Sequence, residues 1–77
     1  MTREQLTEKI KEIARENTGA ELAEGVCLKE CGLDSLSLVA VIAGIEESFG
    51  FFFRDDDLQP DNLTTLEALV QLTENYL

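Results

Sequence analysis

Histidine and tryptophan are absent from this sequence of 77 residues, which has only one proline and two cysteines. A serine hydrolase needs a base beside its nucleophile, and that base is usually histidine. Zinc sites are built from four ligands, drawn mainly from cysteine, histidine and carboxylates. The missing histidine therefore argues against a hydrolase and weakens any zinc site that could be drawn in this chain.

Basic residues are also scarce, because six lysines and arginines stand against sixteen aspartates and glutamates, for a formal net charge of −10. So acidic a surface repels nucleic acid phosphates and anionic membranes, and it steers encounters towards basic proteins. We therefore expect no nucleic acid and no membrane among the partners. A simpler purpose for the acidity, keeping the chain in solution, stays open at this point.

Long apolar runs are missing as well. The longest, Leu38–Ala43, is far shorter than a membrane span. The charged N-terminal segment MTREQLTEKIKEIARE lacks the apolar core of a signal peptide. Hydrophobic residues make up 44% of the chain, which is typical of globular proteins. These features predict one domain over residues 1–77, small for a single hydrophobic core, in a cytoplasmic protein.

Two clusters of potential metal ligands are incomplete. Cys27 and Cys31 are four residues apart without histidine or further cysteine, so zinc would lack two good ligands. A disulfide between them is unfavourable in a reducing compartment, and two small, partly buried thiols are the simpler interpretation; their redox state stays open. The run Asp55–Asp57 lacks the spaced ligands, glycine and distal glutamate of a calcium-binding EF-hand. We expect a solvated acidic loop and no metal site.

Capping residues and apolar residues at helical spacing predict helices at both ends of the chain. Near the N-terminus, Thr2 and Gln5 form a capping-box pattern, and residues 17–19 are a stop signal. The expected core positions of this helix are Leu6, Ile10 and Ile13. Near the C-terminus, Thr64 and Glu67 form a second capping-box pattern. The apolar face that follows comprises Leu66, Leu69, Val70 and Thr73, extended by Leu72, Tyr76 and Leu77.

Two connections separate the predicted helices. Residues 18–33 carry no strong periodicity, and four apolar residues in them could hold the segment against a core: Leu22, Val26, Leu28 and Leu33. FFFRDDDLQPDNL, residues 51–63, predicts a loop with one short helical turn beginning at Pro60, and two of its three phenylalanine rings buried with one partly exposed. No strand of useful length is evident. The predicted fold class is all-α, a small three-to-four-helix bundle with a long loop between its first two helices.

A middle helix is predicted from Ser35 to Phe49, with Asp34 as its N-cap and Gly50 at its end. Apolar residues on one arc of this helix form an ordinary core face: Leu38, Val41, Ile42, Ile45 and Phe49. A second apolar arc, flanked by acids, comprises Leu36, Val39, Ala40 and Ala43, with Glu46 and Glu47. An exposed apolar strip edged by acids is typical of a protein-docking surface, whereas a central bundle helix is buried on most sides. Both interpretations remain open, and Gly44 would suit close packing.

Ser35 stands in the first turn of this helix, where three roles compete. A hydrolytic nucleophile lacks its base, because the chain has no histidine and no Ser-x-x-Lys spacing begins at Ser35. A modification site is chemically better placed, because a phosphodiester there would lie near free N–H groups and the positive end of the helix dipole. A serine that merely begins a helix fits the same position.

The segment GLDSL, residues 32–36, resembles the signature of acyl and peptidyl carrier proteins. The likeness continues through IEESFG at 45–50, DL at 57–58 and NLTTLEAL at 62–69. It covers roughly residues 26–77 in order, and the first predicted helix agrees in length and placement. GLDSL alone is weakly specific, but with the chain length, the acidity and the helix layout it indicates this family.

This resemblance implies that a phosphopantetheinyl transferase attaches 4′-phosphopantetheine from coenzyme A to Ser35, and that the thiol of the arm carries intermediates as thioesters. It implies a carrier and not an enzyme, because partner enzymes supply the catalytic groups. The implied partners are the transferase, an acyl- or aminoacyl-loading enzyme and downstream synthases with basic docking surfaces, and the chain would act as a monomer. The residues whose positions imply partner recognition are Asp34, Leu36, Val39, Ala43, Glu46 and Glu47.

The sequence also departs from the family pattern. Fatty-acid carriers are usually acidic soon after the serine, where this chain has Ser37 and Ala40. The departure favours a specialised polyketide, nonribosomal peptide or unusual acyl pathway over housekeeping fatty-acid synthesis, which stays as an alternative. We expect a discrete carrier that begins at Met1, although a fragment of a larger synthase would look similar. A carrier-like adaptor that docks without the arm is the other candidate function.

Overall fold

The computed structural model describes residues 1–77, apart from the side chain of Asp61. The elements and their bounds are α1 (Arg3–Thr18), α2 (Ser35–Phe49), the 3-10 turns η1 (Asp55–Asp57) and η2 (Pro60–Leu63), and α3 (Leu66–Glu74). In the described chain, β-pairing is limited to one isolated bridge between Cys27 and Thr65. The predicted all-α fold with a long loop between its first two helices is confirmed.

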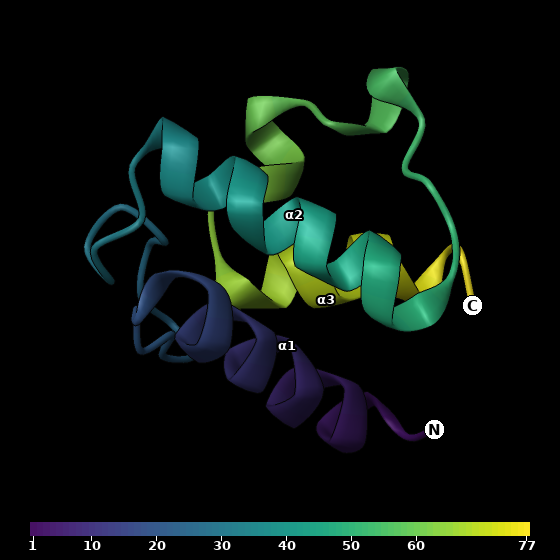
Figure 1. The fold of residues 1–77 in the computed structure, drawn as a ribbon, viewed down its shortest axis with the longest axis horizontal. Helices are drawn as coiled ribbons and strands as arrows, with labels where there is room; N and C mark the ends of the chain where they lie inside the picture. Colours follow the sequence, from purple (N-terminus) through teal and green to yellow (C-terminus); the bar gives the residue numbers. More distant parts are fainter.

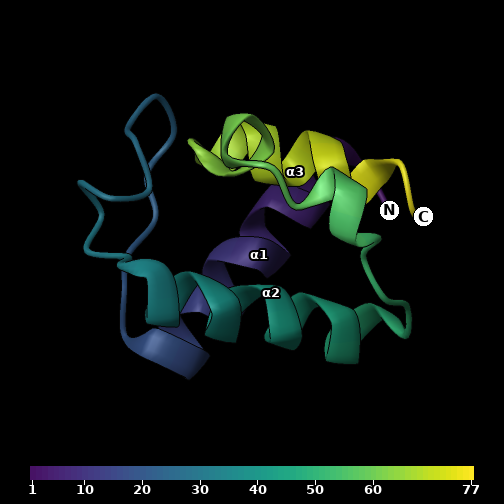
Figure 2. The same cartoon turned by 90° about the horizontal axis from the view of Figure 1, so that it is seen from above.

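The three helices pack around a common core. α1 contacts both α2 and α3, and Figure 2 shows it crossing behind them, with its start behind α3 and its end behind α2. The long loop that follows α1 closes one end of the bundle, whereas both termini lie at the opposite end, where the chain leaves α2 (Figure 1). The most deeply buried large side chains are Leu6, Ile10, Val41, Ile45, Leu66, Leu69, Val70 and Thr73. Among the described residues, no helix is long and apolar enough to cross a bilayer.

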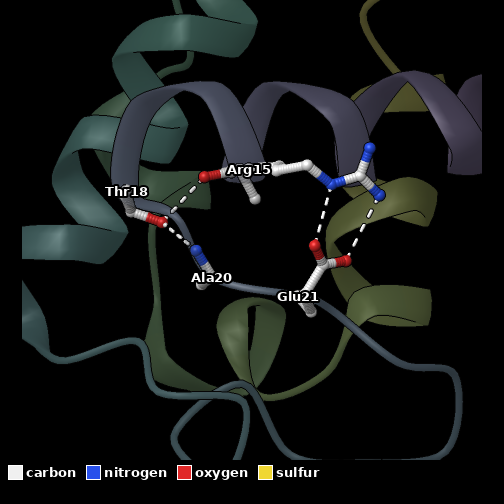
Figure 3. Close-up of polar contacts among 5 residues, drawn as sticks. Arg15, Thr18, Ala20 and Glu21 are labelled. Atoms are coloured by element: carbon white, nitrogen blue, oxygen red, sulfur yellow. Dashed lines mark hydrogen bonds and ion pairs between the residues drawn. The ribbon is translucent and has the colours of Figure 1, made fainter.

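Local signals at both ends of α1 form as the sequence predicts. The hydroxyl of Thr2 accepts a hydrogen bond from the backbone N–H of Gln5 at 3.1 Å, and the Gln5 side chain accepts from the Thr2 N–H at 2.8 Å. The helix ends at Thr18, inside the predicted stop signal. The Arg15 guanidinium then binds the carboxylate of Glu21 at 2.9 and 3.2 Å, which holds the start of the long loop against α1 (Figure 3).

The loop between α1 and α2 is anchored to the start of α3. Of the four apolar residues expected to hold it, Val26 is half-buried and three are buried: Leu22, Leu28 and Leu33. The N–H of Leu28 donates to the carbonyl oxygen of Thr64 at 2.8 Å, and the N–H of Gly25 donates to the carboxylate of Glu67. The loop therefore brings the residues before α2 next to those before α3.

The N-cap of α3 is one residue later than predicted. Thr65, not Thr64, caps the helix, and its hydroxyl accepts from the N–H of Ala68 at 3.1 Å. The expected capping box is wrong because its two members bond the α1–α2 loop, Thr64 through its carbonyl group and Glu67 through its carboxylate. The helix also ends at Glu74, so Tyr76 and Leu77 follow it and do not extend it.

The connection from α2 to α3 contains two 3-10 turns, where the sequence predicts one. Pro60 opens η2 as predicted, while η1 was not expected. Of the three phenylalanines, Phe53 is buried, Phe51 is half-buried and Phe52 is 84% exposed, which is more than the partial exposure expected. The rings of Phe51 and Phe53 pack against Tyr76 with centroid distances of 5.0 and 5.1 Å, which ties this connection to the C-terminus.

Candidate functional site

Ser35 is the first residue of α2, and it is exposed. Asp34 caps the helix, since its Oδ1 accepts a hydrogen bond from the backbone N–H of Ser37 at 2.8 Å. This bond is the main cause that lowers the pKa of Asp34 below its ordinary value. The Ser35 hydroxyl has no hydrogen-bond partner in the described part of the chain, so it is accessible from solvent.

A pocket of about 440 Å³ opens beside Ser35. Six of the residues that line it are apolar, namely Leu28, Leu33, Leu38, Leu58, Pro60 and Leu63. The others are Cys27, Lys29, Asp34, Ser35 and Thr64. The pocket exists because the α1–α2 loop, the first turns of α2 and the η1–η2 segment converge at this end of the molecule. An apolar cavity with a few polar groups at its edge can shelter the apolar part of a bound group.

The second apolar arc of α2 lies in solvent. Leu36 is 81% exposed and Val39 is 63% exposed. Ala43 is also exposed and Ala40 is half-buried. The predicted core face packs inward instead, since Val41 and Ile45 are buried and Leu38, Ile42 and Phe49 are half-buried against the core. Of the two interpretations of this helix, the exposed strip is therefore the correct one, and it begins one residue after Ser35.

The two acids beside this strip differ in their surroundings. Glu47 is exposed on the surface of α2, whereas Glu46 is half-buried. The carboxylate of Glu46 accepts a hydrogen bond from the N–H of Phe53 at 2.8 Å, and its backbone carbonyl accepts from Gly50 and Phe51. Glu46 therefore fixes the chain that leaves α2, a contribution that sequence spacing alone does not reveal.

Among the described residues, no three histidine, cysteine, aspartate or glutamate side chains gather in a way that could hold a metal ion. Cys27 and Cys31 are both free thiols; Cys31 is half-buried as expected, whereas Cys27 is exposed at the pocket, so the expected partial burial is wrong for Cys27. Asp57 in the acidic run is bonded to the side chain of Tyr76, not to its acidic neighbours.

A family model described as the phosphopantetheine attachment site matches residues 5–73. The chain is 31% identical over 81 residues to the acyl carrier protein of Coprothermobacter proteolyticus, covering 100% of this chain and 96% of that relative. It is 43% identical over 68 residues to an acyl carrier protein homolog of Mycoplasma pneumoniae, covering 82% and 81% of the two chains.

A solved structure shares the fold. It is the crystal structure of the Bradyrhizobium japonicum glycine:[carrier protein] ligase complexed with glycylated carrier protein, with a TM-score of 0.71 and 25% sequence identity. The match covers 91% of this chain and 96% of the matched chain. The fold is thus that of a small helical carrier protein. The chain belongs to the phosphopantetheine-binding family of acyl carrier proteins.

The cofactor of this family is 4′-phosphopantetheine, and the residues at the start of α2 fit it. An exposed hydroxyl without a partner can take a phosphodiester, the start of a helix favours a negative charge, and the apolar pocket can hold the arm or its cargo. The sequence-predicted residues Asp34, Ser35, Leu36 and Val39 lie together at this end of α2. The pocket itself was not predicted, because it depends on residues 58–63 returning to α2.

Proposed function

We propose that this chain is a carrier protein that holds biosynthetic intermediates as thioesters on a 4′-phosphopantetheine arm attached to Ser35. The observation that supports it best is the exposed hydroxyl of Ser35, on the first residue of α2 and at the edge of the apolar pocket. When bound, the group supplies a terminal thiol on a long flexible arm. The chain would then need no catalytic base of its own, because its partner enzymes bring one.

The residues around Ser35 position its hydroxyl for this attachment. Asp34 caps α2 through Ser37, so the first turn is ordered and Ser35 is presented in one place. The positive end of the helix dipole favours a negatively charged phosphodiester on Ser35. The pocket beside it can keep water from an apolar cargo.

The exposed strip of α2 is the proposed docking surface for the partner enzymes. Leu36, Val39 and Ala43 would fill apolar contacts, with Glu47 at their edge. A net charge of −10 favours partners with basic surfaces. We expect these partners to be a phosphopantetheinyl transferase, an acyl- or aminoacyl-loading enzyme and downstream synthases, with the carrier acting as a cytoplasmic monomer of one domain.

For the pathway, we propose that the carrier serves specialised metabolism, in preference to housekeeping fatty-acid synthesis. The early turns of α2 have Ser37 and Ala40 where fatty-acid carriers are usually acidic. The structural relative is described as a glycylated carrier protein in complex with its ligase, which supports an aminoacyl cargo. Both curated relatives are named as acyl carrier proteins, so an acyl cargo is the alternative. Charging the modified protein separately with an aminoacyl ligase and an acyltransferase distinguishes the two.

Incubation with a broad-specificity phosphopantetheinyl transferase and coenzyme A tests the attachment. We expect intact-mass analysis to show the gain of one phosphopantetheine, and peptide mapping to place it on Ser35. Ser35→Ala should abolish the gain, whereas Ser37→Ala, two residues away in the same turn, should keep it. No gain in the wild-type protein, or a gain that persists in Ser35→Ala, contradicts the proposal.

The exposed strip also favours a second candidate, an adaptor that docks through α2 without being modified. An adaptor would bind its partner equally well as wild type and as Ser35→Ala, and it would stay unmodified beside an active transferase. A carrier would also keep partner binding in Ser35→Ala, but the partner enzymes would no longer turn over. Binding is therefore the same in both cases, and the turnover of the partner enzymes with Ser35→Ala is the measurement that separates the two functions.

A further inference from the structure

Lys29 is the one cationic side chain among the described residues that line the pocket beside Ser35. It is exposed and lies in the turn just before α2, where the N–H of Gly32 donates to its carbonyl oxygen. Three of the six basic residues are held in ion pairs with carboxylates elsewhere, namely Arg3, Lys11 and Arg15. The Lys29 ammonium group has neither an ion pair nor a hydrogen bond in the described part of the chain.

One carboxylate lines the same pocket as Lys29, that of Asp34. Its Oδ1 is bonded to the backbone N–H of Ser37, and Asp34 forms no ion pair with Lys29 among the described groups. The protein as a whole carries a net charge of −10, so the field around it is unfavourable to a further negative charge. Lys29, as the cationic residue in the lining, is therefore the natural partner for an anion attached at Ser35.

We propose that Lys29 binds the phosphodiester of the arm and so directs the arm into the pocket, away from the docking strip on α2. This inference rests on the proposed attachment at Ser35. The phosphodiester would be bonded to Ser35 itself, which lines the same cavity as Lys29. A lysine ammonium on a flexible stem is a good point charge for phosphate and carries three donors. Lys29 is thus a positioning residue and takes no part in any covalent step.

The contact between Lys29 and the phosphodiester would set the fraction of time that the arm lies in the pocket and the fraction that it spends in solvent. An exposed ion pair of this kind shifts a local equilibrium by about twofold to fivefold, and salt weakens it. A docked arm keeps its cargo beside the apolar lining, whereas a free arm can reach an enzyme that docks on Leu36 and Val39. A modest bias suits a carrier, because a tight contact would prevent delivery.

Lysine NMR tests the proposal directly, because the chain contains only three lysines, Lys9, Lys11 and Lys29. The protein is labelled with 13C-lysine, and the side-chain CεH2 signals are compared before and after full conversion with transferase and coenzyme A. We expect the Lys29 signal to shift on modification while the Lys9 and Lys11 signals, from residues on α1, stay in place. High salt should return the Lys29 signal towards its unmodified position.

The 31P signal of the phosphodiester gives a second readout on variants of the modified protein. Lys29→Gln should move this signal towards that of a free phosphodiester, Lys29→Arg should largely keep it, and Lys9→Gln should leave it unchanged. A Lys29 signal that does not move, in a sample whose mass shows complete attachment, would overturn the role of Lys29 while leaving the carrier function intact. Failure of attachment to Ser35 is a different result, because it overturns the proposed function itself.

Discussion

Gly44 lies where α2 packs closely against α1. A Cβ atom at this position would lie 2.7 Å from Cγ2 of Ile13 and 2.8 Å from Nδ2 of Asn17. The Asn17 amide is itself held, because it donates to the carbonyl oxygen of Ile13 at 2.8 Å. Glycine inside a helix costs about 1 kcal/mol relative to alanine, so the close packing of the two helices must outweigh that cost.

We expect Gly44→Ala to lower the free energy of unfolding by about 1 kcal/mol, because overpacking of about 1–3 kcal/mol exceeds the gain in helix propensity. Urea unfolding followed by helical circular dichroism measures the change. Ser48→Ala, at an exposed position of the same helix, serves as the control and should stay within about 0.5 kcal/mol of wild type. An unchanged or raised stability of Gly44→Ala would show that the two helices separate easily.

At the scale of elements, capping residues and apolar spacing predict where helices lie, but they do not predict contacts between segments that are distant in sequence. The bounds of α2 follow from Asp34 and Gly50, whose capping roles need only neighbouring residues. The start of α3 was misplaced because two adjacent threonines can both cap, and the choice depends on Leu28 and Gly25, which are distant in sequence. The pocket beside Ser35 could not be predicted for the same reason, since three segments must first come together.

The exposed strip of α2 gives a prediction at this scale. Val39→Asp places a charge at the centre of the strip, so docking of the transferase and of loading enzymes should weaken and kcat/KM for modification should fall by about tenfold or more. Because Val39 is 63% exposed, the melting temperature should change by less than about 4 °C. Kinetics of phosphopantetheine transfer and a thermal melt measure both.

Ser48→Asp is the matched control, because it adds the same charge about 180° around the helix from Val39. It should modify at nearly the wild-type rate. If Val39→Asp instead unfolded the protein, the strip would belong to the core; if both variants lost activity equally, net charge and not the strip would govern docking.

Over the whole molecule, Tyr76 near the C-terminus is linked to the pocket through the segment that connects α2 to α3. The Tyr76 hydroxyl donates to the carboxylate of Asp57 and accepts from the N–H of Arg54 at 2.9 Å. The carbonyl of Asp57 accepts from the side chain of Asn62 at 2.8 Å, and the next residue, Leu58, lines the pocket. The segment that forms one wall of the pocket is therefore held from behind by the C-terminus.

This arrangement predicts an alkaline dependence. Burial, and then the hydrogen bond to Asp57, raise the pKa of Tyr76 above the value of about 10 found in unfolded chains. The folded state thus holds the phenolic proton more tightly, so the stabilisation is complete below about pH 10 and is lost as the pH rises towards the folded pKa. Tyrosinate absorbance reports this residue alone, because the chain has one tyrosine, and it should appear at higher pH in the native protein than in urea.

Tyr76→Phe separates the hydrogen bonds from the ring packing, since a phenylalanine can still stack on Phe51 and Phe53. At neutral pH we expect the helical signal to be kept, while amide exchange over residues 54–58 becomes faster and the NMR methyl signals of Leu58 and Leu63 shift. Leu77→Ala, at the exposed last residue, should change neither. If the methyl signals in the pocket stayed in place while amide exchange at residues 54–58 rose, the hydroxyl would hold only the local turn, and the pocket wall would be positioned by its own packing against α2.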